Sequence, residues 1–215
     1  MIWQLDLLNA DQIQYLKSHY TQEQFESGVK SNPNTTLKNN LMMKDNHQYK
    51  LLHDYFVRHL WSCEKLSSIF IANKFSQNYF LWYKEGMKYD YHIDNYPIAG
   101  VNADLSMTVF LSEPDEYEGG ELVIKVGDVE TFHKPKAGTA IIYNTGLWHK
   151  INRVISGERK VVVGWIESKV KNSFIRDHVI NYGLTIEEMS DTICFDYLQK
   201  LEQFRINLIR EYGSN

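Results

Sequence analysis

The chain has few cysteines and little excess charge, and each shortage argues against a class of protein. Its two cysteines, Cys63 and Cys194, stand in unrelated contexts without metal-type spacing, so we expect reduced thiols and a reducing compartment. A formal net charge of -4 over 215 residues leaves no basic footprint for a phosphate backbone. Nucleic acid is therefore not the expected partner.

Membrane and export signals are also missing. No apolar run approaches the ~20 residues that a helix needs to cross a bilayer. The first residues, M-I-W-Q-L-D, lack the basic start and the apolar stretch of a secretory signal. We therefore expect a cytoplasmic protein with no membrane partner. The 14 Tyr, 10 Phe and 5 Trp residues suit a β-rich core.

The residue pattern along the chain changes twice, which predicts three segments. Residues 1–78 show helical spacing behind the cap candidates Asn9 and Asp45, so we expect an N-terminal helical support region. Residues 79–170 consist of short extended runs and predict a double-stranded β-helix core. Residues 171–215 return to helical spacing. Their apolar stripe would either dock onto the core or form a homodimer contact.

Eight runs in the central segment have the length and the flanking turn residues of strands. They cover about 79–84, 88–94, 104–111, 120–126, 129–134, 138–144, 148–154 and 158–167. Eight antiparallel strands in two packed sheets form a jelly roll, so the expected fold class is mainly β, cupin-like, with flanking helices. In that topology the second and the seventh strand are neighbours.

Other expectations are local. Residues 64–74 are interpreted as a short third helix, and a helix through Phe174 should stop at Tyr182-Gly183, with a second cap at Thr185. The turn-rich stretches 27–40 and 95–103 are expected to be loops. Whether these loops act as lids is left open.

A metal site is expected where the second strand ends and the seventh strand begins. His92 and Asp94 stand two residues apart, and alternate residues of a strand share a face. The H-x-D pattern alone is weak, because His and Asp are mostly ordinary surface residues. With His149 on the neighbouring strand, however, it gives the two-histidine, one-carboxylate face of non-haem Fe(II) sites that activate oxygen.

Arg159 follows ten residues after His149, at the start of the last predicted strand, on the same face as Val161. An arginine in an apolar interior is costly unless an anion meets it. A planar guanidinium suits a carboxylate through two parallel hydrogen bonds. A solvent-facing Arg159 beside Glu158 and Lys160 is the alternative.

Five blocks of the sequence resemble the Fe(II)/2-oxoglutarate dioxygenases, and more narrowly the prolyl-4-hydroxylase-type branch with its bacterial PKHD-type hydroxylases. The blocks are H-I-D-N (92–95), D-L-S-M-T-V-F-L-S-E-P-D-E-Y-E-G-G-E-L (104–122), K-A-G-T-A-I-I-Y (136–143), L-W-H-K-I-N-R-V (147–154) and G-E-R-K-V-V-V-G-W-I-E-S (157–168). They occur in the family's order and with its spacing from the distal histidine to the arginine. The resemblance covers about residues 79–170.

The resemblance implies a role for each candidate residue. His92, Asp94 and His149 would bind Fe(II), and together with Arg159 they would form the catalytic set. Arg159 would bind the far carboxylate of the cosubstrate 2-oxoglutarate, and Tyr83 would help to hold that cosubstrate. Dioxygen would be the oxidant, and ascorbate is carried over as a further cofactor. Asp94 also argues against a halogenase, which needs that ligand position free for chloride.

Three further residues match positions near the substrate pocket of prolyl hydroxylases: Tyr89, Asn95 and Trp165. Trp165 would equally serve as a core aromatic. The implied reaction is hydroxylation of a C–H bond of a prolyl residue in a peptide or protein, with release of succinate and CO2. A free amino acid or a small metabolite is the alternative substrate. A non-catalytic cupin-like binding module, or a hydrolytic zinc site with the same ligands, is the alternative of another class.

Overall fold

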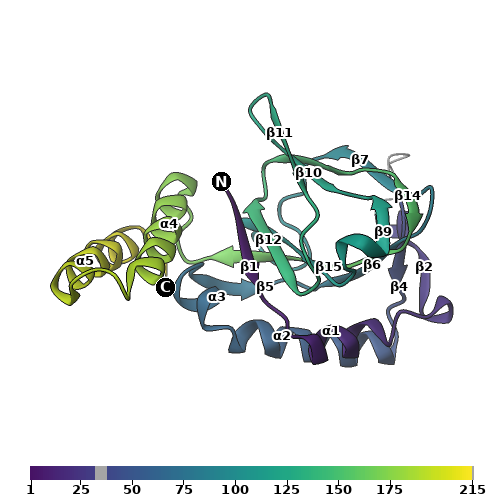
Figure 1. The fold of residues 1–215 in the computed structure, drawn as a ribbon, viewed down its shortest axis with the longest axis horizontal. Coiled ribbons are helices and arrows are strands. Elements are labelled where there is room, and N and C mark those ends of the chain that lie inside the picture. The colour runs from purple at the N-terminus through teal and green to yellow at the C-terminus, as the bar shows by residue number, and fades with distance from the viewer. Residues whose placement is uncertain (32–37, 215) are drawn as a thin grey trace.

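Two antiparallel sheets form the body of the protein in the computed structural model, which describes residues 1–31 and 38–214 (Figure 1). The larger sheet has the strand order β1-β12-β8-β15-β6-β4-β2, and β5 also pairs with β15. Its strands are β1 (Ile2–Asp6), β2 (Phe25–Ser27), β4 (Leu41–Met43), β5 (Ala72–Phe75), β6 (Tyr79–Tyr83), β8 (Leu105–Phe110), β12 (Thr139–Asn144) and β15 (Arg159–Ser168).

The smaller sheet has the order β11-β10-β13-β7-β3. Its strands are β3 (Lys38–Asn39), β7 (Lys88–His92), β10 (Leu122–Val126), β11 (Val129–His133) and β13 (Trp148–Ile151). A separate ribbon pairs β9 (Tyr117–Gly119) with β14 (Val154–Gly157). All eight expected strands are present in this arrangement, and the expected mainly β jelly roll is confirmed.

Helices cover one face of the larger sheet. Figure 1 shows α1 (Ala10–Lys17) and α2 (His47–Ser62) lying along that face, and the short α3 (Glu64–Ser68) follows α2. Alternation along β6 explains the two cores. Phe80 and Trp82 pack in the cluster that includes the helix residues, whereas Leu81 and Tyr83 pack between the sheets.

All six residues of strand β8 are buried. Leu105, Met107 and Val109 face the helices, and Phe110 faces the smaller sheet. Both faces are covered, so polar residues on this strand sit inside the protein rather than at its surface.

The N-terminal region is more than a helical support, because it also supplies β1 to β5. The cap at Asn9 is confirmed, with its side chain and that of Gln12 each accepting from the other's backbone N–H. The expected cap at Asp45 is wrong by one residue, since Asn46 accepts from the N–H of Tyr49. The helix expected over 64–74 is also wrong beyond α3, because β5 pairs with β15 there.

The polar stretch 27–40 lies partly outside the described residues. Its described parts include the end of β2, the 3-10 turn η2 (Gly28–Ser31) and β3. Two further 3-10 turns are η1 (Gln22–Gln24) and η3 (Pro114–Glu116). The stretch 95–103 contains no named strand or helix, as expected of a loop. The division of the chain at residues 78 and 170 stays a prediction.

The C-terminal region is a pair of helices that projects from one end of the β body (Figure 1). Helix α4 (Ser173–Met189) passes through Tyr182-Gly183, so both the expected stop there and the cap at Thr185 are wrong. Gly183 instead allows a close approach, because a Cβ there would lie 2.9 Å from Nε of Arg205 on α5 (Phe195–Tyr212).

The apolar stripe of α5 meets the body near the end of the helix. Leu208 and Ile209 join a cluster with Ile71 and Val170, so the expected docking holds for this part. Other large side chains of the helix are exposed: Phe195, Tyr197, Phe204, Ile206 and Tyr212. No helix in the described part of the chain is both long and apolar enough to span a bilayer.

Candidate functional site

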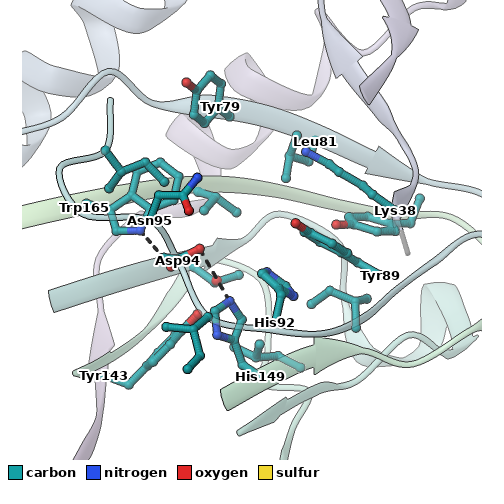
Figure 2. A pocket seen from close by; sticks show the side chains of 17 residues that line it. Lys38, Tyr79, Leu81, Tyr89, His92, Asp94, Asn95, Tyr143, His149 and Trp165 are labelled. Atoms are coloured by element: carbon teal, nitrogen blue, oxygen red, sulfur yellow. Dashed lines mark hydrogen bonds and ion pairs between the residues drawn. The ribbon is translucent and has the colours of Figure 1, made fainter. Parts of the chain in front are cut away.

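His92, Asp94 and His149 converge at one point of the smaller sheet, as expected (Figure 2). His92 is the last residue of β7, and it lies directly opposite His149 in the register with β13. Ligand atoms of the three side chains all lie within 4.8 Å of one another. Nε2 of His149 is 3.8 Å from Oδ1 of Asp94. The three residues can therefore contact a single metal ion.

Both imidazoles are oriented by the backbone carbonyl two residues before them. Nδ1 of His92 lies 2.8 Å from the carbonyl oxygen of Asp90, and Nδ1 of His149 lies 3.0 Å from that of Leu147. A carbonyl oxygen only accepts, so each Nδ1 carries the proton and each Nε2 keeps its lone pair for a metal. Burial, and then His149, lowers the pKa of His92 from 6.5 to about 4. The neutral, metal-binding form of His92 is therefore favoured.

The carboxylate of Asp94 is held by two donors from the larger sheet. Nε1 of Trp165 and Oγ of Ser106 each donate to Oδ2 of Asp94 at 2.8 Å. With Oδ2 occupied in this way, Oδ1 is the oxygen that faces His149. Such outer hydrogen bonds fix the orientation of a metal ligand. The donor set thus fits a divalent ion with two imidazoles and one carboxylate.

Ser106 was not among the site residues predicted from the sequence, although its place in the sequence gives a signal. It is a hydroxyl in the middle of an apolar strand, and it points to the same face as Thr108. Trp165 was expected to contact the substrate or to fill the core. It is only 5% exposed, it lines the pocket, and it also binds Asp94.

A pocket of about 200 Å³ opens beside the three ligands (Figure 2). The candidate substrate residues Tyr89 and Asn95 line it, as does Tyr83. The ring of Tyr89 stacks on His92, with centroids 3.6 Å apart and planes 17° from parallel. Lys38, which was not singled out in the sequence, lines the same pocket.

Arg159 is only 1% exposed, which confirms the interior orientation over the solvent-facing alternative. Its guanidinium carbon lies 5.1 Å from the ring centroids of both Tyr83 and Phe110. Its Nε and Nη2 atoms are buried without a hydrogen-bond partner in the described structure. Unpaired buried donors on a cation are costly, and an incoming carboxylate would satisfy them.

The surroundings of Arg159 are rich in tyrosine. Tyr83 is its direct register partner and connects it to the pocket, which Arg159 itself does not line. Burial raises the pKa of Tyr83 to about 12 and that of Tyr143 well above 10, so both hydroxyls stay protonated and can donate. The hydroxyl of Tyr117, whose pKa also responds to Arg159, is a further buried donor without a partner in the described residues.

Comparison with known proteins agrees with this geometry. The family model of the 2OG-Fe(II) oxygenase superfamily matches residues 76–167. A PKHD-type hydroxylase of Prochlorococcus marinus strain MIT 9301 is 33% identical over 214 residues, which cover 96% of each chain. A second one, from strain MIT 9215, is 36% identical over 180 residues and 81% of each chain.

A solved prolyl-4-hydroxylase from Pseudomonas putida has a similar fold, with a TM-score of 0.55 at 19% identity over 78% of this chain and 92% of that one. At that identity the likeness concerns the fold alone. The near full-length match to curated relatives goes further. This chain belongs to the PKHD-type hydroxylases of the 2OG-Fe(II) oxygenase superfamily and is an Fe(II)- and 2-oxoglutarate-dependent enzyme.

Proposed function

We propose that this enzyme hydroxylates a C–H bond of a prolyl residue in a peptide or protein, with release of succinate and CO2. The observation that carries the proposal is the pairing of two features across one pocket. Three converging ligand side chains lie on one side, and a buried guanidinium with unpaired donors lies behind Tyr83. A metal and a carboxylate-bearing cosubstrate would satisfy both.

Each group in the site then has a task. Nε2 of both histidines and Oδ1 of Asp94 would hold Fe(II), while Trp165 and Ser106 keep the carboxylate turned toward it. Arg159 and Tyr83 would bind the far carboxylate of 2-oxoglutarate. With O2, the bound iron and cosubstrate supply the oxidation of the C–H bond.

The remaining residues of the pocket would handle the substrate. Tyr89 forms the pocket wall beside His92, on which its ring stacks. The exposed Asn95, which follows Asp94 in the sequence, lies at the rim. The apolar lining, including Leu81 and Val163, would limit the water around the reacting carbon. Ascorbate as a reductant stays a prediction.

The choice of a prolyl residue is supported by the fold neighbours, which include the prolyl-4-hydroxylase from Pseudomonas putida. A prolyl hydroxylase from Trichoplax adhaerens, solved in complex with a peptide fragment, is another, with a TM-score of 0.54 at 14% identity. A free amino acid or a small metabolite is the second candidate. A homodimer through α4 and α5 and a cytoplasmic location also stay predictions.

The test couples two readouts. Purified protein with Fe(II), 2-oxoglutarate and O2 should release succinate faster when a suitable proline-containing peptide is present, and the peptide should gain one oxygen atom by mass. His92→Ala should abolish both signals, whereas His47→Ala, at an exposed position on α2, should keep them. Full turnover by His92→Ala would contradict the site. Oxygen gained only by free amino acids would favour the second candidate.

A further inference from the structure

Lys38 is the only lysine or arginine among the described residues that line the pocket. Its place is set by strand pairing, because β3 runs antiparallel to β7 with Lys38 directly opposite Tyr89. Nζ of Lys38 lies 5.4 Å from the ring centroid of Tyr89, and that ring stacks on the imidazole of His92. The ammonium group is thus one aromatic ring away from a metal ligand.

The side chain of Lys38 reaches into the pocket from the side opposite Asn95 and Trp165 (Figure 2). A substrate placed between these walls would lie beside the iron with Lys38 on one flank. Arg159 is elsewhere, buried behind Tyr83 on the larger sheet. The two cations therefore serve different parts of the site.

The charges of the loaded site point to an anion near Lys38. Fe(II), Asp94, the dicarboxylate of 2-oxoglutarate and Arg159 together carry no net charge. Lys38 adds one positive charge to this neutral set. Asp94 attracts the ammonium group of Lys38, and iron would take up much of that carboxylate's charge once it binds. A half-buried ammonium in such a site favours an incoming negative group.

We propose that Lys38 is a substrate-recognition residue that binds a carboxylate of the substrate close to the carbon that is hydroxylated. This inference rests on the proposed function and narrows its substrate class to acidic molecules. The carboxylate has two sources, the α-carboxylate of a free amino acid and the side chain of an Asp or Glu next to a target proline. Both present the same chemistry to the ammonium group.

Equilibrium binding tests this without relying on turnover. The protein is loaded anaerobically with Fe(II) and 2-oxoglutarate and titrated by calorimetry with two matched pairs of probes. One pair is L-proline and L-prolinamide, and the other is N-acetyl-Pro-Asp-amide and N-acetyl-Pro-Asn-amide. The pair that shows the larger preference for the acid identifies the source of the carboxylate.

In the parent protein, one acid should bind roughly 10- to 100-fold more tightly than its amide, as expected for a charge-assisted hydrogen bond. Lys38→Met should abolish this preference, and Lys38→Arg should restore most of it. Lys88→Met is the matched control on the paired strand, because the ammonium of Lys88 is already bound to Asp90 at 2.7 Å. This control should keep the preference.

Three results would overturn the inference: no preference for either acid in the parent, a preference that survives in Lys38→Met, or an effect of Lys38→Met on 2-oxoglutarate affinity alone. The last result would assign Lys38 to the cosubstrate. Failure of the proposed function can be told apart from failure of this inference. The first would appear as no hydroxylation of any substrate tested, whereas the binding preference would still report on Lys38.

Discussion

The indole of Trp165 holds the metal-site carboxylate, with Nε1 donating to Oδ2 of Asp94 at 2.8 Å. Trp165→Phe removes this donor and keeps the aromatic bulk. We expect metal affinity to fall about 10- to 100-fold, as for other outer-shell changes. Titration of the metal-free protein with Co(II) measures the loss.

Ser106→Ala removes the second donor to Asp94 and should also weaken Co(II) binding. Trp148→Phe, at a residue that is 51% exposed, is the control and should leave the affinity unchanged. Unaltered Co(II) affinity in both Trp165→Phe and Ser106→Ala would show that Asp94 is oriented by other means.

Arg159→Met should separate function from stability. Losing two charge-assisted hydrogen bonds should weaken 2-oxoglutarate binding by roughly 100-fold or more. In the absence of cosubstrate, the midpoint of thermal unfolding should be unchanged or higher, because the buried donors Nε and Nη2 have no partner in the described structure. Calorimetry with 2-oxoglutarate and a thermal scan provide the two readings.

The exposed Arg153 supplies the comparison for this experiment, and Arg153→Met should change neither quantity. A large drop in the unfolding temperature of Arg159→Met, with unchanged affinity for 2-oxoglutarate, would mean that the guanidinium serves the fold rather than the cosubstrate.

The pH dependence of acid binding should follow Lys38. Burial lowers its pKa from 10.5 to about 8, opposed by the attraction of Asp94. The ammonium is therefore present below about pH 8 and lost above it, so affinity for the acid probe should fall as pH rises through this value. His92, Asp94 and Tyr89 are the other groups facing Lys38, and titrations of the loaded protein at several pH values measure the change.

Lys38→Arg is the informative variant here, because an arginine keeps its charge over this range and should remove the loss of affinity. The same shift has a defined effect on stability. Between pH 8 and 10.5 the unfolded chain binds this proton more strongly than the folded one, so the contribution of Lys38 to the free energy of unfolding rises with pH. Equal loss of affinity in parent and variant would exclude Lys38 as the titrating group.

Loosening helix α5 should leave the catalytic rate unchanged. Arg205 ties it to α4, with Nε donating to the carbonyl of Val179 at 3.0 Å, and it also reaches the carbonyl of Ser68. Arg205→Ala should speed hydrogen exchange of the amides in 195–212, consistent with a local loss of about 1–3 kcal/mol. Succinate release should stay within about twofold of the parent.

Arg210→Ala, at an exposed position on the same helix, should leave the exchange rates alone. If Arg205→Ala instead abolishes turnover, the helical pair contributes to the site, although no residue of α4 or α5 is among the described residues that line the pocket.

The metal site could be predicted from the sequence because its geometry follows from local rules. Alternation puts His92 and Asp94 on one face, and jelly-roll topology makes β7 and β13 neighbours, as the pairing of His92 with His149 confirms. The interior position of Arg159 followed from the same alternation. Strand order and parity indicated these positions, and the resemblance of five sequence blocks to the Fe(II)/2-oxoglutarate dioxygenases implied their roles.

The failures came from contacts between distant segments. Gly183 has the residue type of a helix end, yet it lies where α4 meets Arg205, which no local pattern reveals. Ser106 and Lys38 acquire their roles from strands that pair far along the chain. β3 has only two residues and lacks a periodic signal, so the position of Lys38 opposite Tyr89 was not predictable.

The convergence of two imidazoles and one carboxylate on a single ferrous ion, next to a bound dicarboxylate, is tested most directly by anaerobic titration. Fe(II) and 2-oxoglutarate are added to the metal-free protein while the visible spectrum is recorded. We predict a metal-to-ligand charge-transfer band that is absent in His92→Ala and that needs far more 2-oxoglutarate in Arg159→Met. A parent protein that binds both components without this band, or a His92→Ala variant that keeps it, would contradict iron chelation at this site.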